Sequence, residues 1–316
     1  MKTLFLILSL ISAPGIAAPK DLSAPFAQLY ALEDSHSQLA NLPAQFDEKI
    51  HPYFFLIIPG ILSDYLDYTI GKIDRETENK FMNFLSKHGM QENIDFQKLS
   101  LKEGYSGEAT PELNRQAIIQ AIQNAPKPVL LFTHSKASVD TLLTLLEYPG
   151  LQNKIAGWVA SQSPFHGSPI ADQVCEHPLE GFPAALLFEL FAGNSEGLQS
   201  LQSQVREQFM LNHAREIAKL TQKIPTISFA SYLKANEVNG WMGIVDGLYG
   251  QKMNAEYLGE HDGLVQVPST VLPGADFAIF EGLNHLSDNR REKPYTALSI
   301  LLLQKLGVIT PVVSQP

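Results

Sequence analysis

Residues 128–138 read Pro128-Val129-Leu130-Leu131-Phe132-Thr133-His134-Ser135-Lys136-Ala137-Ser138. The apolar run is typical of a buried strand and stops abruptly at His134 and Ser135. A helical pattern of apolar residues, which includes Val139 and Leu142, begins directly after it. This order predicts a sharp turn that lifts the Ser135 hydroxyl to the end of a sheet, beside a helix N-terminus that stabilises negative charge.

A serine presented in this way forms a nucleophile elbow, whose usual pattern is G-x-S-x-G. Small flanking residues are favoured there because the strand and the helix pass close together. Here the flanking residues are Thr133 and Ala137. We expect the Thr133 side chain to point away from the helix. A serine at a turn also caps helices through hydrogen bonds to backbone N–H groups, so a catalytic Ser135 requires partners elsewhere.

Partners of the required types follow Ser135 along the chain. Residues 259–265 place Asp262 in a loop before an apolar stretch, and a predicted short strand is followed by a loop that contains His285. The order serine, acid, histidine is the one that accompanies this elbow. A serine hydroxyl needs a base to take its proton, and the base needs an acid to hold its tautomer. We therefore predict Ser135, Asp262 and His285 as the catalytic residues.

The acid has alternatives in the same part of the chain. Asp262 precedes a glycine, and Asp-Gly is a common turn signal without catalytic content. Glu260 and Asp246 are competing acids, whereas Asp276 lies too near the predicted strand of the histidine.

The histidine also has alternatives. His134 adjoins Ser135, but we expect its side chain to point into the packing around the elbow. His166 and His261 fall in predicted loops, where either is placed to line a pocket.

Four segments together resemble the α/β-hydrolase superfamily and, within it, bacterial lipases and esterases. Residues 56–62 are similar to the strand and oxyanion loop, and residues 133–138 to the elbow. Residues 163–169 are similar to the T-P-H-x-G-S-P pattern of lipases, and the stretch from His261 to His285 resembles the acid and histidine region. The chain departs from the pattern at the elbow flanks and at Pro59, where many relatives carry a histidine before the glycine.

An oxyanion hole of two backbone N–H groups follows from this reasoning. The residue after the nucleophile supplies one donor, which is Lys136. The resemblance implies the second donor, Ile61, because Gly60 lets the preceding loop turn tightly. We expect the Lys136 side chain to be exposed. In the alternative interpretation, Pro59 and Gly60 form only a turn that ends a strand.

The alternation of apolar and helical segments predicts an α/β fold with a mainly parallel sheet and helices on both faces. Together with the resemblance, this is the α/β-hydrolase fold. The predicted strands are residues 51–58, 96–101, 129–133, 155–160, 224–232 and 277–281. The predicted helices are residues 26–32, 73–87, 112–124, 136–147 and 295–306.

One domain is predicted over residues 19–316, with a helical cap inserted at about residues 170–223. This segment is too long for a crossover with one helix, and its apolar residues suit acyl chains or an interface. In the alternative interpretation, it is a helical pair packed on the core. Residues 236–257 form a second excursion that we place at the opposite wall of the pocket.

The first 18 residues are typical of a signal peptide: a positive start, a short apolar run and small residues near Ala17 and Ala18. They predict a secreted or periplasmic protein. The single cysteine, Cys175, forms no internal disulfide. The net charge of −10 argues against nucleic acid as a partner. We find no metal-ligand pattern and no cofactor motif.

The sequence thus predicts an exported serine hydrolase that cleaves carboxylic esters, most specifically lipid or acyl esters. The expected partner is an ester or lipid substrate, with transient contact between the cap and a lipid interface. Two alternatives stay open. The altered elbow flanks suit a binding protein that has lost catalysis on the same fold, and the same triad also serves acyltransferases and thioesterases.

Overall fold

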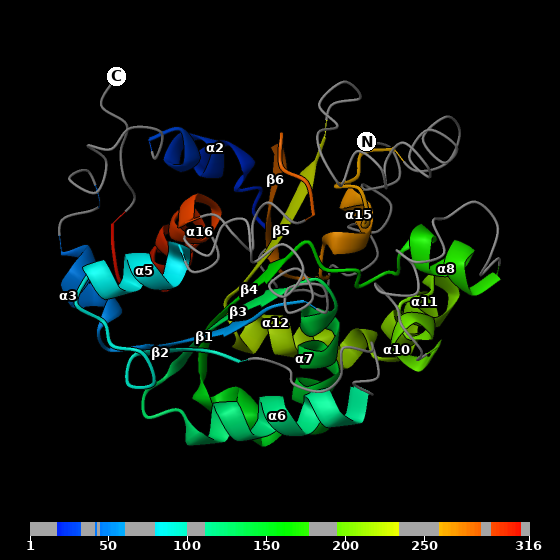
Figure 1. Ribbon diagram of the computed structural model, residues 1–316, viewed down its shortest axis with the longest axis horizontal. Helices are drawn as coiled ribbons and strands as arrows, with labels where there is room; N and C mark the ends of the chain where they lie inside the picture. The colour runs from blue at the N-terminus through cyan, green and yellow to red at the C-terminus, as the bar shows by residue number, and fades with distance from the viewer. Residues whose placement is uncertain are drawn as a thin grey trace, which may run out of the picture.

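A single parallel sheet forms the centre of the molecule (Figure 1). The computed structural model describes residues 18–32, 42, 45–60, 80–99, 111–176, 195–233, 259–285 and 292–310. Within these ranges, six strands pair in the order β2-β1-β3-β4-β5-β6, and every neighbouring pair is parallel. The strands are β1 (Phe54–Ile58), β2 (Phe96–Lys98), β3 (Val129–His134), β4 (Ile155–Ser161), β5 (Thr226–Tyr232) and β6 (Asp276–Glu281).

Helices cover both faces of this sheet (Figure 1). One face is covered by α6 (Pro111–Asn124), α7 (Lys136–Glu147) and α12 (Ala214–Lys223), and the other by α2 (Ser23–Leu32), α5 (Lys80–Lys87) and α16 (Glu292–Lys305). The remaining described helices are α3 (Phe46–Ile50), η2 (Pro149–Lys154), α8 (Pro169–Glu176), α10 (Ser195–Gln199), α11 (Ser203–Asn212) and α15 (Val267–Thr270). The predicted α/β-hydrolase architecture is confirmed.

Alternate residues of the buried strands divide between two hydrophobic clusters. In β1, Leu56 and Ile58 belong to the cluster under α6 and α7, whereas Phe55 and Ile57 belong to the cluster under α5 and α16. This is the period of two that a strand imposes on its side chains. Strands buried on both faces therefore read as continuous apolar runs, which is why β1 and β3 were recognisable in the sequence.

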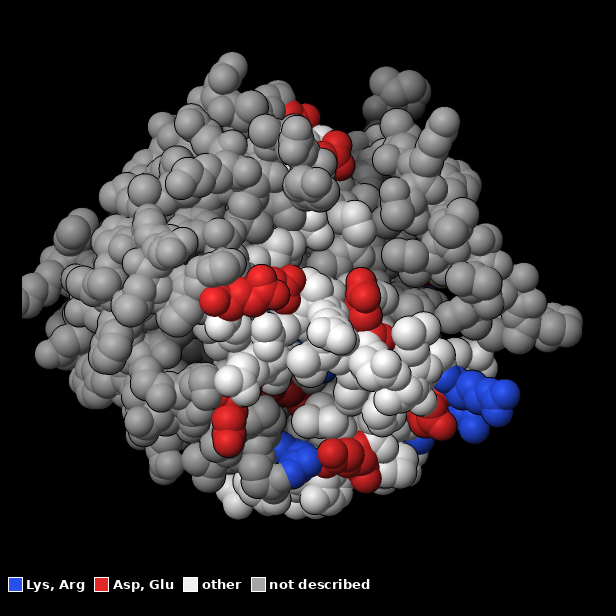
Figure 2. Space-filling model, turned by 90° about the vertical axis from the view of Figure 1, so that its right-hand side faces the viewer, with Lys and Arg blue, Asp and Glu red and all other residues white. Residues whose placement is uncertain are grey.

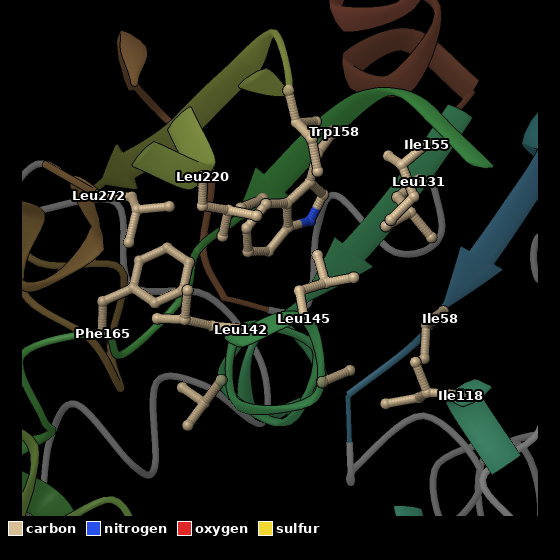
Figure 3. Packing of buried hydrophobic residues seen from close by; sticks show 14 of the residues in the cluster. Ile58, Ile118, Leu131, Leu142, Leu145, Ile155, Trp158, Phe165, Leu220 and Leu272 are labelled. Carbon is tan, nitrogen blue, oxygen red and sulfur yellow. The ribbon is translucent and has the colours of Figure 1, made fainter. Parts of the chain in front are cut away.

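The face under α7 packs around Trp158 of β4, whose indole is fully buried. Figure 3 shows Leu145 of α7 turned toward Trp158 of the sheet, and Leu142 of the same helix beside Phe165. This packing fixes α7 against the strands, and α7 begins directly after Ser135. The orientation of the elbow is therefore set by the hydrophobic core.

Several element boundaries differ from the sequence prediction. β1 begins at Phe54 instead of residue 51, because the preceding residues form a turn in which the Tyr53 N–H donates to the Ile50 carbonyl at 3.0 Å. β5 begins after Pro225, which cannot donate to a ladder. α6 starts at Pro111, a residue that suits the first helical position. The part of the predicted helix 73–87 before Lys80 lies outside the described residues.

The predicted cap segment contains two kinds of described helix. α12 packs against α7 on the sheet face, with Ile217 and Leu220 buried. α8, α10 and α11 lie beside one another at one end of the sheet (Figure 1). They are joined closely, because Asp172 of α8 accepts hydrogen bonds from the backbone and hydroxyl of Ser203 at 2.7 and 2.6 Å. The capping role stays a prediction, and residues 177–194 and 236–257 lie outside the described ranges.

The Thr133 side chain faces the helix, contrary to the expectation from sequence. Its hydroxyl lies 2.8 Å from the Ser138 hydroxyl in α7 and accepts a hydrogen bond from the indole N–H of Trp158, also at 2.8 Å. Thr133 and Ser138 are both fully buried. The elbow accommodates a threonine because its hydroxyl joins β3, β4 and α7 through hydrogen bonds. An apolar side chain at this position would leave these partners without their hydrogen bonds.

Replacement of Thr133 by valine keeps the volume and removes this junction. We expect Thr133→Val to lower the free energy of unfolding by about 1–3 kcal/mol, because the Trp158 N–H stays buried without its acceptor. Urea denaturation monitored by tryptophan fluorescence measures the change.

Thr141→Val is the matched control, since the Thr141 hydroxyl is equally buried but has no hydrogen-bond partner among the residues that the structure describes. This substitution should leave the free energy of unfolding unchanged or raise it slightly. Equal losses in both variants would show that the Thr133 junction contributes nothing specific.

Candidate active site

The candidate site lies where the strand order reverses. β1 pairs with β2 on one side and with β3 on the other, so successive crossovers diverge between β1 and β3. Ligands of open α/β sheets bind at the carboxyl ends of strands at such a point. Gly60 follows β1 and Ser135 follows β3 there. A Cβ atom at residue 60 would lie 2.8 Å from Ser135 Cβ and 3.0 Å from His134 Nδ1, so the close approach requires glycine.

The backbone of Ser135 adopts the conformation of a sharp turn. Its φ of 53° and ψ of −133° lie in a region of backbone conformation that residues other than glycine rarely adopt. The Ser135 N–H donates to the Ser161 carbonyl at 2.9 Å, which continues the pairing of β3 and β4 into the turn. The Ser135 side chain makes no capping hydrogen bond to α7. Its hydroxyl is therefore available for another partner.

The structure brings Ser135, His285 and Asp262 into one chain of hydrogen bonds. His285 Nε2 lies 2.9 Å from Ser135 Oγ, and His285 Nδ1 lies 2.8 Å from Asp262 Oδ2. Asp262 and His285 are 1% and 2% exposed, whereas Ser135 is partly exposed. The buried pair thus ends at a hydroxyl that a substrate can reach, which is the arrangement that activates a serine.

The loop around Asp262 holds the carboxylate in place. Asp262 Oδ1 accepts hydrogen bonds from the N–H groups of Leu264 at 3.0 Å and Val265 at 2.8 Å. Oδ2 is left to face His285. Because a carboxylate only accepts, a neutral His285 carries its proton on Nδ1 and presents an unprotonated Nε2 to the Ser135 hydroxyl. The Asp-Gly turn and the acid position coincide in one loop, where Gly263 has a φ of 105°.

Two of the three competing acids lie in the described residues and are not bonded to His285 there. Glu260 is exposed, and Asp276 pairs with Lys305 and with the backbone N–H of Lys20. Asp246 lies outside the described residues.

His134 and His261 have structural partners, whereas His166 Nε2 has no hydrogen-bond partner among the described residues. The His134 ring is buried 4.7 Å from the His285 ring, and its pKa is held well below the usual range by burial and then by repulsion from His285. His261 Nδ1 accepts the Gly263 N–H at 3.0 Å and so belongs to the Asp262 loop. His166 follows β4, and its side chain is half-buried. Burial and then the charge of Arg206 lower its pKa to about 4.

The expectation of an exposed Lys136 side chain is wrong. Lys136 is 1% exposed, and its ammonium group contacts both carboxylate oxygens of Asp140 at 2.8 and 2.6 Å. Asn114 of α6 donates to the same carboxylate at 2.7 Å. The pair forms because residues four apart share one face of α7, and α6 supplies the third polar group. The ammonium group is therefore occupied beneath the elbow.

The two predicted oxyanion donors have different standing in the structure. The backbone N–H of Lys136 begins α7 directly beside Ser135. Ile61 lies outside the described residues, although Gly60 before it adjoins Ser135. The roles of Lys136 and Ile61 as donors stay predictions.

Sequence reasoning missed Gln162, which is fully buried directly after β4 with a φ of 47°. Its amide nitrogen donates to the Asn284 carbonyl at 3.0 Å, next to His285. No local pattern indicates this contact, because 122 residues separate its two ends. In the described ranges, we find no group of three or more His, Cys, Asp or Glu side chains that fits a metal ion. No described helix has the length and apolarity that crossing a membrane requires.

The depressed pKa of His166 predicts a pH-dependent stability. In the unfolded chain a histidine takes a proton near pH 6.5, whereas folded His166 stays neutral down to about pH 4. Unfolding therefore becomes easier as the pH falls through this window, by on the order of 2 kcal/mol for this half-buried ring. Urea denaturation at pH 7 and pH 4.5 measures the loss, which we expect to shrink in His166→Gln. An undiminished loss in that variant would assign the dependence to other groups.

Comparisons with known proteins agree with this architecture. No family model matches the chain, and no curated protein matches it in sequence. Among solved structures, the mature form of the Bacillus licheniformis lipase BlEst2 superposes with a TM-score of 0.59 and 15% identity, over 80% of this chain and 92% of that one. A metagenomic carboxyl esterase superposes with a TM-score of 0.62 and 17% identity, over 96% and 98% of the two chains. At such low identity the likeness concerns the fold: this chain has the α/β-hydrolase fold of lipases and esterases.

Proposed function

We propose that this protein is a serine hydrolase that cleaves carboxylic esters through an acyl-enzyme. The observation that carries the proposal is the chain of hydrogen bonds from Asp262 through His285 to Ser135. It lies at the strand ends, where this fold binds ligands. Gly60 adjoins it, at a position where no side chain would fit. Geometry of this kind recurs wherever a serine is activated, independent of sequence position.

The reaction uses each of these groups in turn. His285 Nε2 takes the hydroxyl proton as Ser135 Oγ attacks the ester carbonyl carbon, and Asp262 stabilises the imidazolium. The oxyanion is held by the N–H of Lys136 and, by resemblance, of Ile61; each donor is worth about 3 kcal/mol of transition-state stabilisation. His285 then protonates the leaving alkoxide. In the second half, His285 takes a proton from water, whose oxygen attacks the acyl carbon. The bond from the acyl carbon to Ser135 Oγ then breaks, His285 returns the proton to Oγ, and the acid leaves.

Lipid or other acyl esters are the substrates that we propose. The two similar structures are a lipase and a carboxyl esterase, and we carry ester cleavage to this chain from that likeness together with the site geometry. Figure 2, a view from the right-hand side of Figure 1, shows both Asp and Glu and, in its lower part, Lys and Arg side chains on the described part of this face. The net charge of −10 favours uncharged substrates over polyanions such as nucleic acid.

The binding-protein alternative depended on the unusual elbow flanks. Thr133 is accommodated by hydrogen bonds to Ser138 and Trp158, and Ala137 packs in the hydrophobic core, so neither residue supports a loss of catalysis. Acyl transfer to an alcohol would use the same acyl-enzyme with a different acceptor. Addition of a primary alcohol to the ester assay distinguishes transfer from hydrolysis by the products formed.

Ester hydrolysis should depend on the Ser135 hydroxyl. We expect the chain to hydrolyse p-nitrophenyl esters, and Ser135→Ala to lower kcat/KM by at least about 10⁴-fold, because the nucleophile is lost. Assays from acetate to palmitate give the acyl preference and separate an esterase from a lipase. Ser299→Ala is the matched control and should keep full activity. Ser299 lies in α16, on the face of the sheet opposite α7, and its hydroxyl binds the Tyr295 carbonyl of its own helix.

A fluorophosphonate probe provides a second readout that does not depend on the choice of ester. Wild-type protein should be labelled covalently and Ser135→Ala should not. Wild-type protein that is inert toward every ester and toward the probe would overturn the hydrolase proposal in favour of a binding protein.

We further propose that residues 1–18 direct export to the periplasm or the medium and are then removed. Expression of the full chain in a Gram-negative host, followed by fractionation and mass measurement, tests this. The expected product lies outside the cytoplasm and begins after Ala17 or Ala18. A full-length chain retained in the cytoplasm would contradict export and leave the hydrolase proposal intact.

A further inference from the structure

Three backbone groups around His285 are bound by buried partners. The His285 N–H donates to the Asp262 carbonyl at 2.9 Å. The preceding carbonyl, of Asn284, accepts from Gln162 Nε2 at 3.0 Å, and the His285 carbonyl accepts from His134 Nε2 at 2.9 Å. Together they fix the backbone from which the His285 imidazole extends toward Ser135.

The donors in this cluster are determined by their partners. The carbonyl oxygens of Asn284 and His285 only accept, so the amide nitrogen of Gln162 faces Asn284 and Nε2 of His134 carries a hydrogen. Gln162 Oε1 then lies 3.0 Å from the same His134 Nε2. The two side chains support each other, and each also binds one carbonyl of the histidine loop. A single network therefore connects the residue before Ser135 with the backbone of His285.

Gln162 is held rigidly by the centre of the sheet. Its N–H donates to the Phe229 carbonyl of β5 at 2.7 Å, and its amide nitrogen also contacts the Ser231 hydroxyl. Its positive φ of 47° is a conformation that glycine adopts most easily. A glutamine that occupies it indicates that the side chain, and not the turn alone, is required there.

We propose that Gln162, together with His134, is a positioning residue for the base His285. It holds the Asn284 carbonyl so that His285 Nε2 stays within hydrogen-bonding distance of Ser135 while Nδ1 stays on Asp262. The proposal rests on the hydrolase function for its kinetic consequences. Its structural consequence, an ordered His285–Asp262 hydrogen bond, exists with or without ester cleavage.

Two substitutions at residue 162 test this. Gln162→Glu keeps the size and the acceptor toward His134 but presents an oxygen instead of a donor to the Asn284 carbonyl, and Gln162→Leu removes both contacts. We expect kcat to fall about 100-fold in each, with KM nearly unchanged, because a small displacement of the base affects the chemical step and not substrate binding. Ser228→Ala is the control, since it removes a buried hydroxyl of the same strand β5 that bonds the Leu272 N–H at 3.0 Å and not Gln162.

A spectroscopic readout separates positioning from a general loss of structure. The Nδ1 proton of His285, hydrogen-bonded to Asp262, should give a far-downfield proton resonance in wild-type protein and in Ser228→Ala. We expect it to broaden or disappear in both Gln162 variants, while their circular dichroism stays that of the wild type. If Gln162→Leu does not fold, the near-isosteric Gln162→Glu decides the test.

The outcomes separate this inference from the proposed function. Wild-type kcat to within about twofold in the variants, with the resonance retained, would overturn the positioning role and leave the hydrolase proposal standing. The wild-type protein could instead be inert toward esters and still lose the His285 resonance when Gln162 is substituted. That result would overturn the hydrolase proposal and support the positioning role.

Discussion

The parallel pairing of the strands is the constraint on which the site depends. Because all six described strands point the same way, their carboxyl ends meet at one edge. Gly60, Ser135 and Gln162 follow β1, β3 and β4 there, and Asp262 and His285 come from the loops after β5 and β6. Ser135 and His285, which are 150 positions apart, are thereby brought into hydrogen-bonding contact. Where β1 and β3 end, residue 60 lies so close to Ser135 that only glycine fits there.

The strained elbow is stabilised by polar groups that each have partners. Thr133 connects β3 with β4 and α7, and Lys136 and Asp140 neutralise each other beneath the first turn of the helix. A buried network in which every group is satisfied is rigid and favours a single arrangement, whereas one missing partner is costly. These side chains therefore hold Ser135 in a conformation that the local sequence alone disfavours.

The histidine loop is the second fixed element. Asp262 is held by its own turn through Leu264 and Val265, and the backbone of His285 is held by Asp262, Gln162 and His134. The imidazole is thus oriented from both its side chain and its main chain. In this structure, the orientation of His285 depends on the buried groups that bind its loop as well as on its contacts with Asp262 and Ser135.

The sequence by itself determined the order of strands and helices and the turn around Ser135, and it led to the prediction that Asp262 and His285 are the partners of that serine, because periodicity, turn residues and chain order can be read without the fold. It did not reveal that Thr133 faces α7, that Lys136 is buried on Asp140, or that Gln162 holds the Asn284 carbonyl. Only the tertiary structure decided those contacts. A polar side chain is predicted to be exposed when no partner for it can be found in the sequence. The partners come from distant strands and helices, which meet only when the sheet has formed.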